Sequence, residues 1–385
     1  MRKEKLGKRN PAFLYEKKGL AKETAGHINP ALAIAETILR NAPGSVVEFV
    51  GVAGGKEDEL VVRAGYKLHH VKSTALQGSK GLGRLKSLAL AATSPYLPST
   101  VSIIKKFKPD IVIGTGGYAC WPIMAAAARM KIPTALHESN AHPGLAVRRL
   151  QSKVDRIWIN FPETAAAFGN SPKVVCVGNP ILQGFSTVDR KEARTKLGIE
   201  KDQKLILSFG GSNGAEKLNA AVIDFMKSTV KANSKIIHLH ASGKINYEDS
   251  LKLFTDAGLD KAGNCILRPY IYDMPLQMAA ADLVIARAGA MTLSELALMK
   301  KVCVLVPSPY VAENHQYKNA KALADANAAT LVEEKDLGEG KLTEAVRELL
   351  ASDARCYEQQ KNIAAFGRED ACQSIWQDIV CLANK

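Results

Sequence analysis

The sequence lacks the cysteine spacing of a disulfide framework or a zinc site. Its seven cysteines are scattered, their number is odd, and none forms a CxxC pair. Both kinds of site need paired or closely spaced thiols, so we predict reduced thiols in a cytosolic protein. No apolar run approaches the ~18 residues of a membrane-spanning helix. The basic N-terminus has no apolar core of the kind that a secretory signal carries, so we expect no such signal.

Acidic side chains are absent from residues 60–109, although the chain holds 38 Asp and Glu in total. The formal net charge is +14, and this interval combines lysines and arginines with several leucines. A basic stretch with leucines favours an anionic lipid surface over a nucleic-acid groove, in which stacking aromatics are typical. A solvated helix flank whose leucines face the core fits the pattern equally well. We expect no nucleic-acid partner.

Strand-like apolar runs alternate with alanine- and leucine-rich helical stretches along most of the chain. The predicted strands are 46–50, 111–113, 134–136, 156–159, 174–177, 204–209, 235–239, 283–285 and 302–306. The predicted helices include 30–40, 121–130, 144–150, 215–227, 274–281 and 291–299. This alternation indicates parallel sheets with helices on both faces. Because 385 residues are too many for one core, we predict an α/β protein with two doubly wound sheets.

A domain boundary is expected at VGNPI, residues 177–181, because glycine, asparagine and proline interrupt a strand end there. We assign residues 1–178 to the first domain and 179–367 to the second. The closing helix, 368–385, is expected to pack back on the first domain. Ligands of doubly wound sheets bind beyond the carboxyl ends of the strands, so the strand-to-helix turns are the informative places.

The turn in LILSFGGSNGAEKLN, residues 205–219, runs from an apolar strand through glycines into a helix. Glycines let the backbone approach an anion closely, and free amides at a helix start point toward it. Ser212 adds a hydroxyl donor. The segment lacks the lysine of an ATPase P-loop and departs from GxGxxG. We favour phosphate binding here over a tight turn that merely requires glycine.

A second turn lies in ARAGAMTLSELALMKK, residues 286–301. We expect Thr292 or Ser294 to cap the helix that follows, with Glu295 in its first turn. A carboxylate at that place completes a capping box or accepts hydrogen bonds from the vicinal hydroxyls of a ribose. Both interpretations stay open.

His27 stands where the helix of TAGHINPALAIAE, residues 24–36, begins. A helix N-terminus disfavours a positively charged ring and so favours the neutral imidazole. A neutral imidazole at the mouth of a cleft can take a proton from a hydroxyl. A histidine that only caps the turn is the alternative.

Four polar side chains, His137, Glu138, Asn140 and His142, gather in the loop LHESNAHPG. Their spacing matches no zinc pattern. Because hydroxyl-rich ligands need mixed donors and acceptors, we favour a sugar-binding loop over a metal site.

These motifs, together with GTGGYACWP, VGNP and ENHQYKNA, resemble the GT-B glycosyltransferases of bacterial peptidoglycan synthesis. Those enzymes add N-acetylglucosamine from UDP-N-acetylglucosamine to lipid I and make lipid II. The resemblance covers the chain from about Thr24 to the C-terminus in order and spacing. It implies two Rossmann-like domains facing each other across a cleft, with the donor mainly on the second domain. It implies no cofactor and no metal.

The family's site residues carry over by matching motifs. His27 is the implied general base, which takes the proton of the N-acetylmuramic acid 4-hydroxyl as that oxygen attacks the anomeric carbon with inversion. Ser212 is implied on the phosphates, and Glu295 on the ribose. The backbone of Ile271 is implied on uracil, and Gln316 on the sugar hydroxyls. The implied donor-binding residues are Thr24, Ala25, Gly26, Asn140, Ser212, Ile271, Ala290, Met291, Thr292, Leu293, Ser294, Glu295 and Gln316. The candidates for acceptor or cleft contacts are Tyr118, His137 and Glu138.

The resemblance also gives the acid-free segment a role on the cytoplasmic side of the inner membrane, where the lipid acceptor is embedded. The protein would bind that anionic surface peripherally. The membrane-contact candidates are Lys80, Leu82, Arg84, Leu85, Lys86 and Trp121. The alternative functions are a sugar transferase acting on another lipid or glycan, and a catalytically impaired relative that binds UDP-sugars.

Two segments depart from the family pattern. An arginine usually follows GNP by two residues and contacts the nucleotide, but Leu182 stands here. The family also begins with an apolar strand and a glycine-rich turn before TAGH. Here residues 1–23 are rich in charge, and AFLY, residues 12–15, ends too early for that strand. We therefore predict an atypical arm in place of the first strand.

Overall fold

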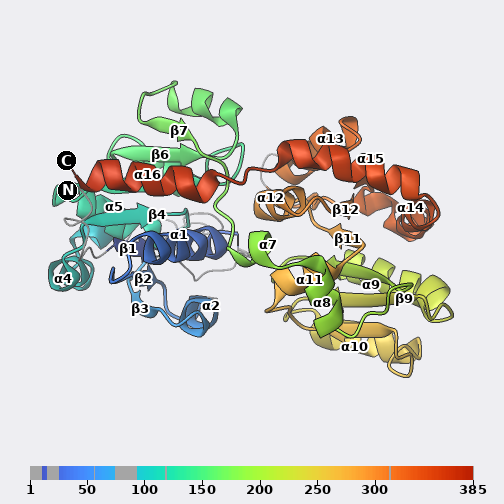
Figure 1. The fold of residues 1–385 in the computed structure, drawn as a ribbon. Coiled ribbons are helices and arrows are strands. Elements are labelled where there is room, and N and C mark those ends of the chain that lie inside the picture. The colour runs from blue at the N-terminus through green and yellow to red at the C-terminus, as the bar shows by residue number, and fades with distance from the viewer. Residues whose placement is uncertain are drawn as a thin grey trace. The chain divides into compact units, whose positions relative to one another are not determined.

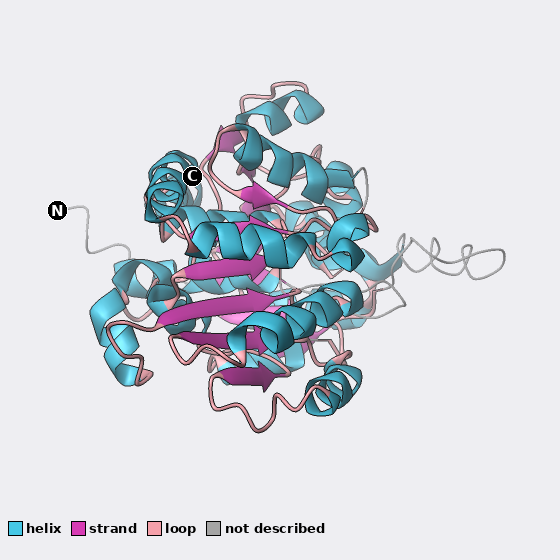
Figure 2. Ribbon diagram, turned by 90° about the vertical axis from the view of Figure 1, so that its right-hand side faces the viewer, coloured by secondary structure: helices cyan, strands magenta, loops and turns pink. Residues whose placement is uncertain are grey.

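The computed structural model describes residues 11–14, 26–55, 57–73, 93–117, 119–311 and 314–384, the first four by their backbone alone. Contacts divide the chain into two units. Unit 1 ends at Leu182 and resumes at Asp370, and unit 2 is Gln183–Glu369. Each unit carries one parallel β-sheet, so the predicted α/β fold with two doubly wound sheets is confirmed (Figure 1). In Figure 2 the helices lie on both sides of the strands.

The described strands of unit 1 form a seven-stranded parallel sheet in the order β3-β2-β1-β4-β5-β6-β7. They are β1 (Pro11–Leu14), β2 (Glu48–Gly51), β3 (Lys67–His70), β4 (Ile111–Gly114), β5 (Thr134–Glu138), β6 (Arg156–Ile159) and β7 (Val174–Cys176). The helices are α1 (Ile28–Asn41), α2 (Glu57–Arg63), α4 (Pro98–Phe107), α5 (Cys120–Arg129), α6 (Leu145–Leu150) and α16 (Ala371–Ala383), with 3-10 turns at Ser94–Tyr96 and Pro162–Phe168. α1 and α16 bury their apolar stripes in the same cluster as Ile113. α4, α5 and α6 bury theirs in a second cluster with Val112, which points to the other face of β4.

The prediction of an arm without a first strand is wrong at Pro11–Leu14. β1 lies in the middle of the sheet, where Phe13 is in register with Phe49 of β2 and with Ile113 of β4. Strand pairing is made by backbone groups, so a short segment can form a strand when two neighbouring strands each need a partner. The charged flanks of this segment hid it from the sequence pattern. The rest of residues 1–23 lies outside the described residues.

The C-terminal helix α16 belongs to unit 1 and packs beside α1 (Figure 1). Ile375 is fully buried, and Asp378 Oδ2 accepts a hydrogen bond of 2.6 Å from Trp158 Nε1. The same oxygen forms an ion pair of 2.8 Å with Arg156 Nε. A helix from the end of the chain therefore completes the core of the first sheet.

The described strands of unit 2 form a six-stranded parallel sheet in the order β10-β9-β8-β11-β12-β13. They are β8 (Lys204–Phe209), β9 (Ile236–Ala241), β10 (Cys265–Arg268), β11 (Leu283–Ala286), β12 (Val302–Leu305) and β13 (Thr330–Leu331). The helices are α7 (Gly184–Thr187), α8 (Arg190–Lys196), α9 (Glu216–Phe225), α10 (Tyr247–Asp256), α11 (Met274–Ala280), α12 (Ala290–Leu298), α13 (His315–Asp325), α14 (Lys341–Leu350) and α15 (Asp353–Ile363). A π-helical turn extends α9 over Met226–Val230, and 3-10 turns occupy Glu334–Glu339 and Ala364–Phe366.

The sequence analysis missed β3, β10 and β13, and each of them lies at an edge of its sheet. An edge strand has a neighbour on one side only and is less fully buried than a central strand, so its sequence is not uniformly apolar. Among the described helices, none combines the length and the apolar character needed to cross a bilayer.

Candidate functional site

Each sheet reverses its strand order beside its first strand. β1 lies between β2 and β4, and β8 lies between β9 and β11. Doubly wound sheets bind ligands outside the carboxyl ends of the strands at such a reversal. The turns that follow β4, β8 and β11 hold some of the candidate residues, and others follow β1, β5, β10 and β12.

The turn from Gly210 to Ala215 joins β8 to α9 and is built for close backbone approach. Gly211 and Gly214 have φ values of +85° and +81°, which favour glycine. A Cβ atom on Gly214 would come within 1.8 Å of Ser242 O. The N-cap of α9 is Ala215, which has no side-chain oxygen that could cap the helix. Amides at a helix N-terminus can bind an anion. The buried Ser212 lies within the turn.

The turn after β11 differs from the sequence prediction. α12 has Gly289 as its N-cap, and neither Thr292 nor Ser294 caps it. Ser294 Oγ instead donates to Ala290 O at 3.1 Å, the carbonyl four residues earlier. Glu295 is the sixth residue of the helix and lies beyond its first turn. A capping box needs the carboxylate three residues after the N-cap, so that interpretation is wrong.

Glu295 is a buried carboxyl group without a hydrogen-bond or ion-pair partner among the described residues, and its exposure is 6%. Burial raises the pKa of Glu295 to about 8. An isolated buried carboxyl group is costly unless something binds it. Vicinal ribose hydroxyls would supply the missing hydrogen-bond donors, so the geometry favours the ribose interpretation over the capping one.

Gln316 lies in the first turn of α13, and its Oε1 accepts a hydrogen bond of 2.9 Å from Ser308 N after β12. This bond fixes the side-chain amide at the carboxyl edge of the sheet. Asn319 Nδ2 donates to Ala288 O at 3.5 Å and ties α13 to the turn before α12. Ile271 follows β10 with an exposure of 3%, so a ligand would meet its backbone rather than its side chain. The same holds for the buried Ala290, Met291 and Leu293 of α12.

His27 is joined to the turn after β4 by two hydrogen bonds. His27 Nδ1 donates to Thr115 O at 2.8 Å, and Thr115 Oγ1 donates back to His27 O at 2.9 Å. A neutral ring with its proton on Nδ1 carries its lone pair on Nε2. His27 is the N-cap residue of α1, but its side chain makes no capping hydrogen bond with the described helix. The capping alternative is therefore wrong.

Gly116 makes room for this ring. Its φ is +101°, and a Cβ atom there would lie 2.8 Å from both Cε1 and Nδ1 of His27. Thr115 and Gly116 lie in the glycine-rich motif GTGGYACWP, and their contacts with His27 were not predictable from it. The contact joins residues 27 and 116, which only the pairing of β1 with β4 brings together.

The loop after β5 does not present all its polar groups outward. His137 is fully buried, and its Nε2 donates to Gly178 O at 3.0 Å. Burial lowers the pKa of His137 to about 4, which keeps the ring neutral. Glu138 accepts from Asn140 Nδ2 at 3.1 Å and from Gly144 N at 2.8 Å. Both side chains organise the loop that holds Asn140, and their direct contact with an acceptor stays a prediction.

The remaining candidates are placed as follows. Thr24, Ala25, Tyr118, Lys80, Leu82, Arg84, Leu85 and Lys86 lie outside the described residues. Gly26 directly precedes His27, and Trp121 is half-buried on α5 beside the second apolar cluster. Leu182 packs against the cluster that contains Ile375 and supplies no charge. Among the described residues no group of three or more His, Cys, Asp or Glu could hold a metal ion.

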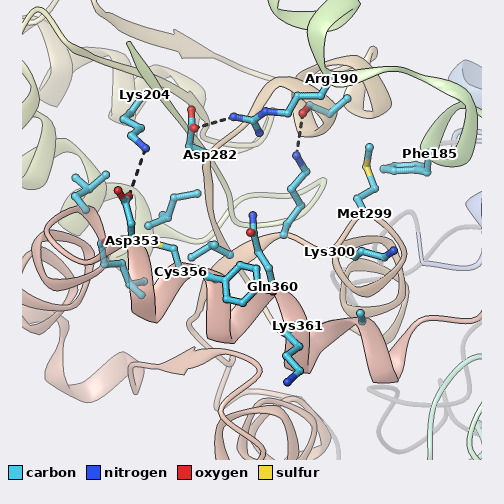
Figure 3. Close-up of a pocket in the computed structure, with 18 of the residues that line it drawn as sticks. Phe185, Arg190, Lys204, Asp282, Met299, Lys300, Asp353, Cys356, Gln360 and Lys361 are labelled. Atoms are coloured by element: carbon cyan, nitrogen blue, oxygen red, sulfur yellow. Dashed lines mark hydrogen bonds and ion pairs between the residues drawn. The ribbon is translucent and has the colours of Figure 1, made fainter. Parts of the chain in front are cut away.

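A cavity of about 800 Å³ lies at the opposite, amino edge of the unit 2 sheet (Figure 3). Its lining includes Lys204 at the start of β8, Asp282 just before β11 and Lys301 just before β12. Lys301 Nζ donates to Ala279 O at 2.8 Å and to Ala281 O at 3.0 Å, so it caps the carboxyl end of α11. Burial lowers the pKa of Lys301 to about 7. This cavity is not at the strand ends where a nucleotide is expected.

Residues 23–159 match the glycosyltransferase family 28 N-terminal domain, and residues 205–375 match the family's C-terminal domain. The chain belongs to glycosyltransferase family 28. It is 40% identical over 356 residues to a UDP-N-acetylglucosamine--N-acetylmuramyl-(pentapeptide) pyrophosphoryl-undecaprenol N-acetylglucosamine transferase of Acetivibrio thermocellus, covering 92% of this chain and 95% of the relative. A protein of the same name from Desulforamulus reducens is 36% identical, covering 91% and 94%.

Solved structures agree with the GT-B fold of this family 28 member. Acinetobacter baumannii MurG superposes with a TM-score of 0.67 at 24% identity, covering 98% of this chain and 100% of that one. A UDP-GlcNAc 2-epimerase from Neisseria meningitidis, bound to UDP-GlcNAc, gives a TM-score of 0.64 at 16% identity, covering 96% and 99%. Because the second protein is an epimerase, the fold alone does not select the reaction.

Proposed function

We propose that the protein transfers N-acetylglucosamine from UDP-N-acetylglucosamine to the 4-hydroxyl of N-acetylmuramic acid in lipid I, forming lipid II with inversion. The observation that carries this proposal is the 40% identity over 92% of the chain to a relative named for such a transfer. The site geometry supplies a physical account of how each step would proceed.

The donor nucleotide would bind to unit 2. The amides at the start of α9 would meet the diphosphate together with Ser212. Glu295 would accept hydrogen bonds from the ribose hydroxyls, and the Ile271 backbone would read the uracil edge. Gln316, fixed through Ser308 N at 2.9 Å, would hold the sugar hydroxyls. Asn140 and Gly26, from unit 1, are proposed on the sugar as well.

The acceptor hydroxyl would be activated by His27. Nε2 would take the proton as the oxygen forms its bond to the anomeric carbon and the bond from that carbon to the diphosphate oxygen breaks. The negative charge that develops on the leaving diphosphate would be stabilised by the amides of the glycine-rich turn. The Thr115 carbonyl, 2.8 Å from Nδ1, would stabilise the imidazolium that forms.

The acceptor is lipid-linked, so we propose a peripheral location at the cytoplasmic face of the inner membrane. The acid-free basic interval 60–109 supports an anionic surface as the partner. The half-buried Trp121 is the one membrane-contact candidate that falls among the described residues.

The test is the release of UDP from UDP-N-acetylglucosamine with and without a lipid I analogue. Release that depends on the analogue is expected. The variant His27→Ala should lose roughly 10²–10⁴-fold in turnover while still binding UDP. Analogue-independent release, or full turnover in the variant, would contradict the proposed reaction or the proposed base respectively.

A second candidate is a UDP-sugar-binding relative with impaired turnover. Leu182, half-buried against the apolar cluster of unit 1, favours it because the place of a nucleotide-binding arginine holds an apolar side chain. Calorimetric binding of UDP-N-acetylglucosamine without turnover on any lipid acceptor would select this candidate.

A further inference from the structure

A buried hydrogen-bonded series of polar side chains lies beneath the glycine-rich turn of unit 2. Ser208 of β8 faces His240 of β9 in the sheet register, and His238 lies two residues earlier on the same face. All three are 0% exposed. α9 covers this face, and its Asn219 is 1% exposed. The proposed reaction uses none of these side chains.

Donor and acceptor roles can be assigned along this series, starting from Ser242 O. Ser242 O can only accept, so Asn219 Nδ2 donates to it, at 2.9 Å, and Asn219 Oδ1 faces His240. His240 Nε2 therefore donates to Asn219 Oδ1, at 3.1 Å. His240 Nδ1 lies 2.8 Å from Ser208 Oγ and 3.2 Å from Ser208 O, and in the neutral ring with its proton on Nε2 it accepts from Ser208 Oγ. Ser208 Oγ in turn accepts from His238 Nε2 at 2.7 Å.

For His240 this sequence of donors and acceptors needs the neutral ring, whereas His238 needs only a proton on Nε2. A second proton on His240 would place a donor on Nδ1, which would turn from Ser208 Oγ to Ser208 O. Burial lowers the pKa of His240 to about 4 and holds the pKa of His238 well below its ordinary value, in agreement with neutral rings. A buried hydrogen-bonded network of this kind favours one geometry, whereas apolar side chains would only fill the volume. Among the described residues, His238 Nδ1 has no hydrogen-bond partner.

The series ends at Ser242 O, which contacts the glycine-rich turn at Gly214. Ser242 O, the acceptor of Asn219, is the atom that a Cβ on Gly214 would strike. A Cβ atom on Gly243 would likewise lie 2.0 Å from Gly214 N. Asn219 also donates to Ser250 Oγ of α10 at 3.1 Å, which fixes the amide from a second side. The place of Gly214 against Ser242 and Gly243 therefore depends on Asn219.

We propose that His240 and Asn219 are positioning residues for the donor diphosphate, because they hold the backbone of Ser242 and Gly243 against Gly214 and so set the amides that the diphosphate meets. This inference rests on the proposed nucleotide site of unit 2. It requires no particular acceptor.

The first test compares two substitutions at one position. His240→Leu fills the volume and donates no hydrogen bond, while His240→Gln keeps an N–H close to Asn219 Oδ1. His240→Leu should weaken UDP binding about tenfold and raise the KM for UDP-N-acetylglucosamine to a similar extent. kcat should fall as well, because the same amides would stabilise the leaving diphosphate, whereas the acceptor KM should stay near its wild-type value. His240→Gln should restore most of the affinity and of kcat. Equal affinities in the Leu variant and the wild type, or equal losses in the two variants, would overturn the proposal.

The second test has a matched control in the same sheet. Asn219→Ala removes the amide at the carboxyl edge, and Asn264→Ala removes an amide that donates to Val230 O, Asn233 O and Ile236 O at the amino edge. Both variants should lower the midpoint of thermal unfolding, but only Asn219→Ala should weaken UDP binding measured by calorimetry. Equal weakening in both variants would reduce the effect to general destabilisation and overturn the proposal. Since UDP binding is measured without an acceptor, a wild type that binds UDP but fails on lipid I would contradict the proposed reaction and leave the positioning role intact.

Discussion

His27 owes its position to a glycine that lies 89 residues further along the chain. The Nδ1 bond to Thr115 O selects the tautomer, and Gly116 leaves the space that the ring occupies. Residue identity and backbone geometry therefore act together, because a base needs both the correct nitrogen and the correct place.

Gly116→Ala should displace His27 and reduce turnover at least tenfold while UDP affinity stays unchanged, because a Cβ atom there would lie 2.8 Å from the ring. The matched control is Gly65→Ala, whose φ is +83° and whose added Cβ would meet nothing within 4 Å. Both substitutions strain the backbone, and only the first touches His27. Steady-state kinetics of the two variants measure the difference. Equal losses of turnover would contradict the role of Gly116 in placing His27.

Glu295 should make UDP binding depend on pH. Burial raises the pKa of Glu295 to about 8 in the free protein, so much of the group is protonated at neutral pH. If the ribose hydroxyls donate to a carboxylate, binding releases a proton and the affinity rises as the pH increases from about 6.5 toward 8.5. Calorimetry in buffers of different ionisation enthalpy measures the released proton. Glu295→Gln should abolish the pH dependence, and a pH-independent affinity in the wild type would contradict the ribose assignment.

The same carboxyl group should affect stability in the free protein. Its pKa is raised on folding, so between about 4.5 and 8 the folded state binds more protons than the unfolded state does. Stability is therefore lost as the pH rises through this window. The melting temperature of Glu295→Gln should be close to that of the wild type at pH 5 and higher than that of the wild type at pH 9. This comparison is a control that needs no ligand.

At the scale of single residues, the sequence identified the groups but not their surroundings. Ser212, Glu295 and Gln316 follow the carboxyl ends of parallel strands, as their motifs indicate. Whether a side chain faces a ligand or the core depends on contacts far away in the sequence. His137 illustrates this limit, because its carbonyl partner at Gly178 lies on another segment.

Among the elements, α16 decides the stability of unit 1. Asp378 receives the Trp158 indole N–H at 2.6 Å and pairs with Arg156 at 2.8 Å. Asp378→Ala should lower the stability of unit 1 by about 2 kcal/mol, because it leaves a buried donor and a partly buried guanidinium without their acceptor. Urea unfolding followed by tryptophan fluorescence measures the change. Lys67→Ala, which removes a side chain of unit 1 that is 63% exposed, should leave the midpoint nearly unchanged and serves as the control.

Central strands and amphipathic helices were predictable because a local pattern of burial marks them. β6 and β8 have the predicted bounds, Arg156–Ile159 and Lys204–Phe209. β1 was not predictable, since four residues among charged neighbours become a strand only through pairing with β2 and β4. Of the edge strands, β7 was predicted and β3, β10 and β13 were not, because an edge strand is less fully covered and its sequence pattern is weaker.

In the whole molecule, the tryptophans offer a probe of one unit alone. The chain has three, Trp121, Trp158 and Trp376, and all belong to unit 1. UDP at about 100 times its Kd should stabilise unit 2 by roughly 2.7 kcal/mol. This corresponds to a rise of about 5–10 °C in the melting temperature of unit 2. Far-UV circular dichroism should record this shift, whereas tryptophan fluorescence should not. Equal shifts by both probes would mean that the units unfold together.

The order of strands, glycine-rich turns and helices in the sequence determined the two α/β sheets and the residue types at their carboxyl edges, because periodicity and turn chemistry act over a few residues. Tertiary structure alone decided the middle place of β1, the tautomer of His27 and the isolation of the Glu295 carboxyl. Each of these depends on atoms that are distant in the chain, and burial, hydrogen bonding and the dielectric around a group are set only when such atoms meet.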